Sequence, residues 1–524
     1  MTRHSTAHVL SLCLAAFALG CDEGKEEPLA DYASAPPLTL DDGLFYAASA
    51  ERALVVDLSA DEPRTTEHAL PVGDARRYER PGTGAREVVV LTSGRDAYKE
   101  GDTRHPAVPS HVLVYARDGE RLRLPLQGRY GELSLSDDGK YAVAFRALGS
   151  LTLQNAVEVI DLARALDGEA GASQVVDLSL DGRAPTRIVF SPATFARRLA
   201  LAPLDNALQV IDLEHPERRE ISITLSEQRS LAPGEILFTD RQIFVQSAGD
   251  QRVISFQLVE LPRGQHSFQL APSVLTASGP VSDIALTGAG ETLRVLALGT
   301  RLDVLDPVVG NHVALDASGF PQLEQFIGRS PVDEQQAPRA MLYGRGRSDV
   351  GFVDLGASGA WPNRRVERVA LSEPIAELLP VPERKLAVGT HASGRMSLID
   401  LEDRTVKVVL LDGPAHGLLV DTAGTPARLW VETTQRTLGI VDLATFVPTM
   451  LPVTLGEPLG TSELRRASAA PGLGNLLLVP GAQRRRVAVL QASASGHVTL
   501  LDAADPQPAT ARELVGIFLS GLFD

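Results

Sequence analysis

Cysteine is nearly absent from this chain of 524 residues, because both cysteines, Cys13 and Cys21, lie within its first 21 positions. The rest of the chain therefore has no residue for a disulfide, a thiolate metal site or a cysteine nucleophile. Beyond these positions the sequence also lacks the 3.6-residue spacing of apolar side chains that predicts amphipathic helices. These absences exclude disulfide scaffolds and helical bundles.

The chain has fewer basic than acidic residues, with 50 Lys and Arg against 66 Asp and Glu. The formal net charge is −16, and the longest basic run is the three arginines at 484–486. Nucleic-acid binding calls for a basic stripe, so the sequence predicts no nucleic-acid partner. With 44% hydrophobic and 22% charged residues the chain has the composition of a packed protein. Its length suits two to four ordinary domains or one large all-β architecture.

The N-terminus has the composition of a secretory signal. Residues 2–21 have a basic start and an apolar stretch from Val9 to Leu19, which is too short to span a bilayer. Residues 17–21, Phe-Ala-Leu-Gly-Cys, resemble the lipobox of bacterial lipoproteins, with Ala18 and Leu19 in exchanged order. The resemblance implies a signal peptide at 1–20 and lipidation of Cys21. The charged, proline-bearing residues 21–37 would then form a flexible tether. A plain secretory signal that leaves a free Cys21 is the alternative.

A short phrase, two apolar residues followed by Asp and usually Leu, recurs along the rest of the chain. Its aspartates are Asp57, Asp161, Asp212, Asp306, Asp354, Asp400, Asp442 and Asp502. The gaps between them are 104, 51, 94, 48, 46, 42 and 60 residues, and each double-length gap holds a degraded copy, at 111–115 and 252–256. Ten units with a mean length of about 49 residues predict the blades of a β-propeller.

Each unit has room for four short strands separated by turns. In the unit that begins near Glu132, residues 136–140, Ser-Asp-Asp-Gly-Lys, predict a tight turn before the apolar strand 141–145. This turn and the apolar-Asp strand end resemble the repeats of bacterial WD40-like or YVTN-type β-propellers, and the likeness extends over about residues 38–520. The resemblance implies an all-β propeller and leaves its function open.

The number of units raises the question of one ring or two. Ten blades exceed the four to eight of a typical closed propeller. The region 38–524 is therefore either one large ring or two rings in tandem, with residues 270–279 as the best position for a division.

Catalytic, metal and cofactor motifs are not found. The repeated aspartate stands before a turn, where a carboxylate accepts hydrogen bonds from turn amides. Residues 356–359, Gly-Ala-Ser-Gly, lack the second half of a nucleophile elbow, and no two histidines beyond the signal have the His-x-x-x-His spacing of a zinc site. We therefore predict no catalytic, cofactor-binding or metal-binding residue. A propeller hydrolase or lyase that gathers side chains from several blades in a central channel remains the alternative.

Long loops indicate where a partner could bind. In a four-stranded meander, the loop between the second and third strands lies on the same face as the connections between blades. Residues 94–110, 146–154 and 457–474 fall on that face, and 328–339 and 356–363 fall on the other. Because recognition usually resides in loops on a rigid scaffold, we predict a partner-binding loop at 94–110, with these side chains: Arg95, Tyr98, Lys99, Arg104 and His105.

These observations predict a non-catalytic binding or scaffolding module of the cell envelope. A lipid at Cys21 would anchor it to a membrane, at the outer membrane or its periplasmic face. Its partner would be an envelope protein or a polysaccharide.

Overall fold

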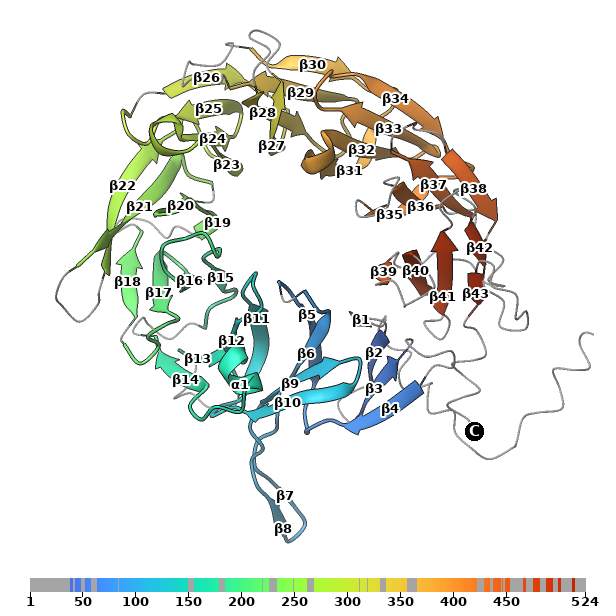
Figure 1. Cartoon of the computed structure of the whole chain (residues 1–524). Coiled ribbons are helices and arrows are strands. Elements are labelled where there is room, and N and C mark those ends of the chain that lie inside the picture. The colour runs from blue at the N-terminus through green and yellow to red at the C-terminus, as the bar shows by residue number, and fades with distance from the viewer. Residues whose placement is uncertain are drawn as a thin grey trace, which may run out of the picture.

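The structure is a computed structural model of the whole chain (Figure 1). It describes residues 38–40, 43–48, 52–57, 64–82, 84–148, 155–178, 184–218, 220–225, 233–247, 249–261, 268–310, 312–317, 319–329, 336–355, 365–421, 428–433, 437–443, 445, 448–452, 465–467, 475–480, 487–492, 498–500 and 511–513. The predicted signal peptide, Cys21 and the tether lie outside these residues.

The chain is an all-β propeller, as the repeat predicts. In the described residues, nine four-stranded sheets and one five-stranded sheet, all antiparallel, lie around a single ring, so of the two arrangements that the sequence left open the structure has one large ring (Figure 1). Each sheet is built from one continuous stretch of the chain, and we number these sheets blades 1 to 10. Residues 270–276, within the stretch considered for a division, belong to the outer strand of blade 5.

Within each blade the first strand lies nearest the ring axis and the later strands lie progressively farther out. Blade 1 contains β1 (Leu38–Leu40), β2 (Gly43–Ala48), β3 (Arg52–Asp57) and β4 (Arg64–Ala69); blade 2 contains β5 (Ala75–Arg80), β6 (Glu87–Thr92), β9 (His111–Ala116) and β10 (Gly119–Pro125). Blade 3 contains β11 (Tyr130–Leu135), β12 (Tyr141–Ala147), β13 (Ala156–Asp161) and β14 (Ser173–Asp177); blade 4 contains β15 (Val189–Phe190), β16 (Leu199–Leu204), β17 (Ala207–Asp212) and β18 (Ile221–Thr224). Blade 5 contains β19 (Pro233–Phe238), β20 (Gln242–Ser247), β21 (Arg252–Glu260) and β22 (Phe268–Thr276).

Blade 6 contains β23 (Asp283–Thr287), β24 (Arg294–Leu298), β25 (Arg301–Leu305) and β26 (His312–Asp316); blade 7 contains β27 (Gln322–Arg329), β28 (Gln336–Tyr343), β29 (Asp349–Asp354) and β30 (Glu367–Ala370). Blade 8 contains β31 (Ile375–Val381), β32 (Leu386–His391), β33 (Arg395–Asp400) and β34 (Val406–Leu410); blade 9 contains β35 (Ala415–Asp421), β36 (Arg428–Thr433), β37 (Thr437–Asp442) and β38 (Pro448–Pro452). Blade 10 contains β39 (Arg465–Ala467), β40 (Asn475–Pro480), β41 (Val487–Ala492), β42 (Val498–Leu500) and β43 (Ala511–Glu513), the last of which also pairs with β41.

Helix is a minor component of the described residues. It comprises α1 (Leu162–Leu166) and the short 3-10 turns η3 (Gly290–Thr292) and η4 (Pro382–Arg384). Asp161 caps α1 by accepting the backbone N–H of Arg164 at 3.0 Å. No helix in this part of the chain is long and apolar enough to cross a membrane.

The apolar core lies between blades. The two middle strands of a blade are covered on both faces by neighbouring sheets, so they are largely buried, as in the six buried residues of β16. Most of these residues are apolar, and a few, such as Glu158 and Asp303, are buried polar ones. The outer strands alternate half-buried and exposed residues, as in β10. One core cluster joins Val89 and Val112 of blade 2 to Leu133 and Ala142 of blade 3. Blades 1 and 10 meet through β1 and β39, which belong to separate sheets.

The repeated phrase marks the third strand. Seven of its aspartates end or directly follow the third strand of a blade, and the degraded copies are the third strands β9 and β21. In blade 10 the phrase follows β42, the fourth strand. The predicted role of the aspartate in turns is confirmed. Asp306 Oδ1 accepts the N–H groups of Val308 and Val309 at 2.9 Å each, and Asp400 Oδ1 accepts those of Glu402 and Asp403 at 2.8 Å each.

We expect Asp306→Ala to lower the free energy of unfolding by about 3 kcal/mol, because it removes the acceptor of two turn N–H groups and the carboxylate that Arg294 contacts at 3.2 Å. Asp306→Asn keeps a turn acceptor and should cost roughly half as much. Urea denaturation measures both against Asp102→Ala, an exposed carboxylate. A loss for Asp306→Ala within about 0.5 kcal/mol of that control would contradict the structural role.

Candidate functional site

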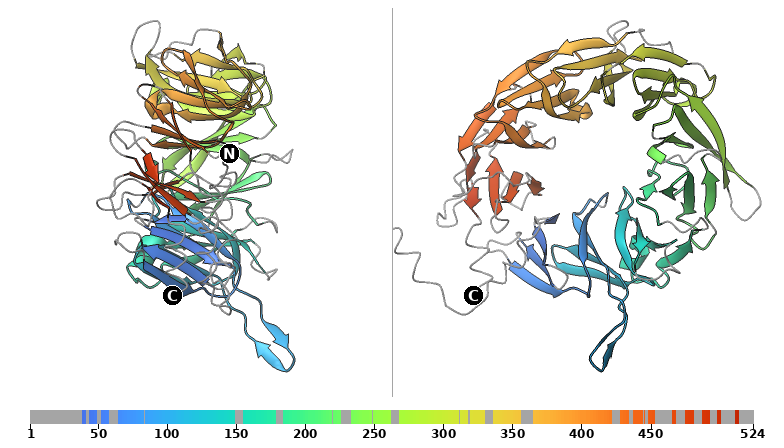
Figure 2. Two further views of the ribbon diagram at one scale, coloured as in Figure 1. Left: turned by 90° about the vertical axis from the view of Figure 1, so that its right-hand side faces the viewer. Right: turned by 180° about the vertical axis from the view of Figure 1, so that it is seen from behind.

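The connection between β6 and β9 is the most prominent projection of the ring. Sequence reasoning predicted an irregular loop at residues 94–110, but the structure corrects this to an ordered hairpin of β7 (Tyr98–Glu100) and β8 (Thr103–His105). The two strands pair Tyr98 with His105, Lys99 with Arg104 and Glu100 with Thr103. Figures 1 and 2 show the hairpin standing away from the ring. We call residues 94–110 the β7–β8 arm.

One side of the arm is stabilised by aromatic contacts. The Tyr98 and His105 rings are stacked at a centroid distance of 4.4 Å and an interplanar angle of 7°. The Arg95 guanidinium lies 5.0 Å from the centre of the Tyr98 ring, which adds a cation–π contact. His105 Nε2 lies 3.6 Å from a carboxylate oxygen of Glu100. The sequence therefore named three side chains, Arg95, Tyr98 and His105, that the fold brings together.

The other side of the arm carries two cations. Lys99 and Arg104 are directly opposite each other in the ladder, so their side chains leave the same face. Both residues are exposed. Like charges in directly opposed positions destabilise a strand pair. This face of the arm is therefore an unfavourable arrangement for the hairpin itself, and an anion placed against it would relieve the repulsion.

The base of the arm is held firmly to the ring. Arg95 and Val108 exchange backbone hydrogen bonds at 2.9 Å each. Arg129, which leads into β11, donates from Nε to the Ser93 carbonyl at 3.2 Å and pairs with Asp96 at 2.5 Å. The arm therefore projects from a braced base.

Of the long loops predicted to share one face, the described residues show one contact near the base of the arm. Leu148, in the connection between β12 and β13, donates its N–H to the carbonyl of Arg129 at 2.8 Å, beside the base of the arm. Residues 149–154, most of 457–474, and most of the opposite-face loops at 328–339 and 356–363 lie outside the described residues.

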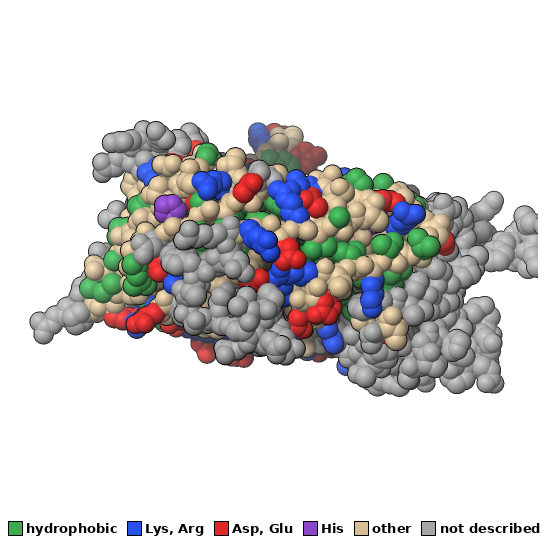
Figure 3. Space-filling model, turned by 90° about the horizontal axis from the view of Figure 1, so that it is seen from above, with side chains coloured by type: hydrophobic (Ala, Val, Ile, Leu, Met, Phe, Trp, Pro, Cys, Tyr) green, Lys and Arg blue, Asp and Glu red, His purple; other side chains and the backbone are tan. Residues whose placement is uncertain are grey.

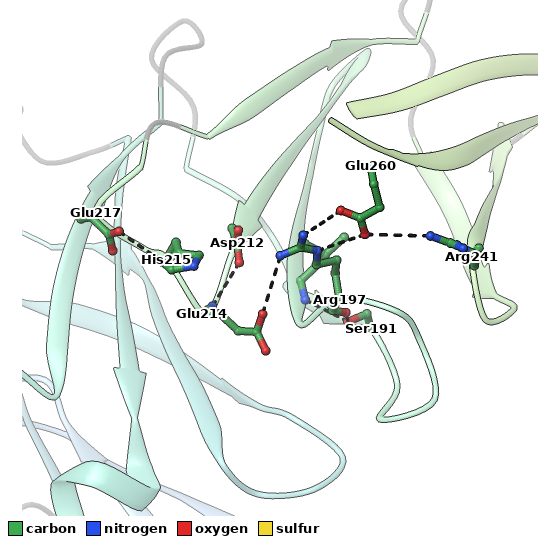
Figure 4. Close-up of polar contacts among 9 residues, drawn as sticks. Ser191, Arg197, Asp212, Glu214, His215, Glu217, Arg241 and Glu260 are labelled. Carbon is green, nitrogen blue, oxygen red and sulfur yellow. Dashed lines mark hydrogen bonds and ion pairs between the residues drawn. The ribbon is translucent and has the colours of Figure 1, made fainter. Parts of the chain in front are cut away.

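The opposite face of the ring carries ion pairs that join neighbouring blades. Figure 4 shows Arg197, between β15 and β16, reaching Glu260 at the end of β21 at 2.7 Å. Arg197 and Arg241 flank this carboxylate, and hydrogen bonding to Arg197 lowers the pKa of Glu260. Arg198 of blade 4 likewise forms an ion pair with Asp138 of blade 3 at 2.8 Å, and Arg404 of blade 8 forms one with Asp354 of blade 7 at 2.5 Å. These charges neutralise each other, so the ion pairs on this face stabilise the packing of neighbouring blades.

Sequence reasoning missed these pairs for a simple reason. Arg197 and Glu260 are 63 residues apart, and neither belongs to the repeated phrase. The one usable signal was the alternation of turns between the two faces, because the first and third turns of neighbouring blades lie on the same face. An arginine in the first turn of one unit can therefore reach an acid at the third-strand end of the next.

Buried polar side chains tie each blade to the connection that leads into it. Glu158 accepts the N–H of Gln127 at 2.9 Å, and Asp303 accepts both the N–H and the hydroxyl of Ser278, at 3.0 and 2.8 Å. Burial raises the pKa of Glu158. These hydrogen bonds lie within the core, where they fix the path of the backbone.

A third buried group resembles a nucleophile with its base. His391 Nε2 lies 2.7 Å from Ser397 Oγ, and His391 Nδ1 lies 3.0 Å from the carbonyl oxygen of Pro374. The two side chains have exposed fractions of 1% and 0%, so no substrate reaches them in this conformation. This pair is a structural tie like those of Glu158 and Asp303.

Carboxyl groups gather on the inner strands of blades 5 to 7. They are Glu235 on β19, Asp283 on β23 and Glu324 on β27. Burial raises the pKa of Glu324, and so does the nearby Asp283. Within the described ranges, no group of three or more His, Cys, Asp or Glu residues could hold a metal ion.

The outer rim of the ring mixes charges of both signs. Figure 3, which looks onto the rim above blades 6 to 8, shows basic and acidic side chains interspersed with apolar ones. The most exposed described apolar residues of a strand in this region are Val408 and Leu410 on β34. This part of the rim shows no single-sign patch comparable with the cation pair of the arm.

Comparison with known proteins yields only partial structural likenesses. No protein-family model and no curated protein matches the chain. Solved structures with partial similarity include the dihydro-heme d1 dehydrogenase NirN, at 15% identity over 66% of this chain and 71% of that chain, with a TM-score of 0.40. Sqt1 of Saccharomyces cerevisiae has 10% identity over 67% of this chain and 92% of that chain, with a TM-score of 0.38. AztD of Citrobacter koseri has 16% identity over 78% of this chain and 92% of that chain, with a TM-score of 0.34. With every TM-score below 0.5, no ligand or activity is transferred from these proteins.

The brace at the base of the arm can be tested at Gly94. This residue has a φ of +64°, and a Cβ added there would collide with the backbone of Val108 and Pro109. We expect Gly94→Ala to speed tryptic cleavage after Lys99 and Arg104 by at least about fivefold, because loosening the base exposes the arm to the protease.

Gly84→Ala is the matched control, since Gly84 has a φ of +74° and open space around its Cβ position. Both variants share the backbone strain, and only Gly94→Ala adds the collision. Equal cleavage rates for the two variants would show that the base of the arm is not braced in this way.

Proposed function

We propose that this chain is a lipid-anchored β-propeller of the WD40-like or YVTN type that acts in the cell envelope as a non-catalytic binding or scaffolding module. The observation that carries the proposal is the β7–β8 arm, a braced hairpin that stands away from the ring. Long ordered projections on a rigid scaffold are typical recognition elements.

The chemistry of the arm supports an anionic partner. Lys99 and Arg104 place two positive charges side by side on an exposed face, in a chain whose net charge is −16. The acidic surface disfavours anionic partners everywhere else, so the arm would select where an anion docks. An envelope protein with an acidic patch or an anionic polysaccharide meets this requirement.

The proposed location rests on the N-terminal sequence. The apolar stretch, Gly20 and Cys21 have the order of a lipoprotein signal, and the acidic residues that follow suit a tether. An anionic body attached by lipid would stand off an anionic leaflet, which would leave the arm free to meet its partner.

A hydrolase or lyase at the ring axis is the second candidate. One observation favours it, namely that burial and the neighbouring Asp283 raise the pKa of Glu235 to about 7, as general acid catalysis near neutral pH would require. The contacts of this pair weigh against it, because Asp283 Oδ2 already accepts the N–H of Leu323 at 2.9 Å. A hydrolase would lose turnover when Glu235 is replaced by Gln, whereas a binding module has no turnover to lose.

Charge reversal on the arm tests the binding role. We expect Lys99→Glu and Arg104→Glu each to reduce recovery of partners from envelope extracts by about tenfold, with a weaker dependence on salt than the wild type. Quantitative mass spectrometry of material captured by the purified protein, at low and at physiological salt, measures the effect.

The matched control is Arg345→Glu, an exposed arginine between β28 and β29, which changes the net charge equally at a distant blade. Tyr98→Ala, which removes the aromatic stack, should also weaken capture. Partner recovery that is equal for the arm variants and the control would refute a binding role of the arm.

Lipidation is tested separately at Cys21. We expect the mature N-terminus to begin at Cys21 with a diacylglyceryl mass, and Cys21→Ala to abolish both this mass and membrane fractionation. Mass spectrometry of the N-terminal peptide decides between the lipoprotein and a plain secreted protein, for which the peptide would carry no acyl mass.

A further inference from the structure

The β7–β8 arm is a sheet of only two strands, so each strand has an edge without a neighbour. Among the described residues, no third strand pairs with β7 or β8. Every residue from Tyr98 to Arg104 is exposed. A two-stranded hairpin is marginally stable by itself, and a third strand is the usual way to stabilise such a small sheet. The arm therefore presents an open sheet edge beyond its braced base.

The turn at the tip of the arm decides which backbone groups face outward from the hairpin. Glu100 and Thr103 flank a two-residue turn, so they form the hydrogen-bonded pair that closes it. Hydrogen-bonded and outward-facing pairs alternate along an antiparallel ladder. The next pair, Lys99 with Arg104, therefore directs its N–H and C=O groups away from the partner strand. The ladder does not continue to the base of the arm, where Pro106 has no N–H.

The two edges of the arm differ in charge. Strand β7 carries Glu100, whose carboxylate lies 3.6 Å from His105 Nε2. Strand β8 consists of Thr103, Arg104 and His105, and it has no acidic side chain. A carboxylate that approaches β8 meets the planar guanidinium of Arg104, which can bind both of its oxygens. An acidic strand is therefore better matched to β8 than to β7.

We propose that the arm binds an extended acidic segment of a protein partner as a third strand, antiparallel to β8. This inference rests on the proposed function, because it names the partner class and the binding mode of the same arm. The residue of the segment opposite Arg104 exchanges backbone hydrogen bonds with it, and a carboxylate on that residue lies on the face shared by Arg104 and Lys99. A polypeptide has the backbone donors and acceptors that this edge requires, and a polysaccharide does not.

The two cations also explain why the open edge does not pair indiscriminately. Short edge strands with cationic side chains are a usual protection against unwanted strand pairing. Lys99 and Arg104 repel basic segments, whereas an acidic segment relieves the repulsion between them. On the other face of the arm, the flanking residues of the segment lie beside Thr103 and His105, where β-branched side chains pack well.

N-methylated peptides test the binding mode on the full-length wild-type protein. The parent peptide has about seven residues, with one central glutamate between alternating Thr and Val, as strand addition requires. Methylation of the glutamate nitrogen removes the donor to Arg104, and we expect it to weaken binding at least about fivefold in fluorescence polarisation. Methylation of a residue next to the glutamate is the matched control, because that nitrogen faces away from β8. Its affinity should stay within about twofold of the parent.

Hydrogen exchange and a charge swap test the same arrangement from the side of the protein. We expect saturating parent peptide to slow exchange of the Arg104 amide about tenfold or more. Arg104→Glu should lose about tenfold in affinity for the glutamate peptide and gain affinity for the same peptide with lysine at its centre. Arg345→Glu, which makes the same change of charge at an exposed position of blade 7, should bind both peptides as the wild type does.

The inference is overturned if the glutamate peptide does not bind, if both methylated isomers bind equally well, or if the Arg104 amide gains no protection. Binding of an anionic polysaccharide, tested as polygalacturonate, without binding of the peptide overturns it as well. In each of these cases the proposed function stands as long as the charge-reversed arm variants still reduce partner capture. If those variants capture partners as well as Arg345→Glu does, the proposed function itself is refuted.

Discussion

Apolar packing between the faces of neighbouring four-stranded sheets is the interaction on which the rest of this structure depends. No blade can bury both of its faces alone, so each core cluster draws its side chains from more than one sheet. Burial of apolar area contributes roughly 25 cal/mol per Å², and the middle strands supply most of that area. The ring is thus stabilised mainly by contacts between neighbouring blades, and the polar groups make their contacts where this packing places them.

The polar groups serve three separate tasks, each assigned by position within the blade. Aspartates at the ends of third strands accept turn amides, so they close the sharp reversals that let a strand return to the same sheet. Arginines in first turns reach acids of a neighbouring blade, and they add directional contacts to packing that is itself non-directional. Glu158, Asp303 and the His391–Ser397 pair anchor the connections from inside. In each case the polar partner is found within the ring.

One place departs from this internal balance, and it carries the functional proposal. The β7–β8 arm extends beyond the packed sheets and opposes Lys99 to Arg104, which the hairpin does not require. Like charges in opposed positions cost the hairpin stability, and features that cost stability are where a binding role is expected.

The sequence by itself determined the repeat, the four strands of each unit and the role of its aspartates, because these depend on spacing of two residues along a strand and on local turn chemistry. It also predicted that residues 94–110 stand on the scaffold as a distinct element, although not that they pair as a hairpin, since Tyr98 and His105 have no pattern that marks them as cross-strand neighbours. Only the tertiary structure decided that the ten units form one ring, because closure depends on the small angle between successive sheets. Only that structure brought Arg197 to Glu260 and Arg198 to Asp138, since the members of each pair come from different blades and their attraction exists only after the blades have packed.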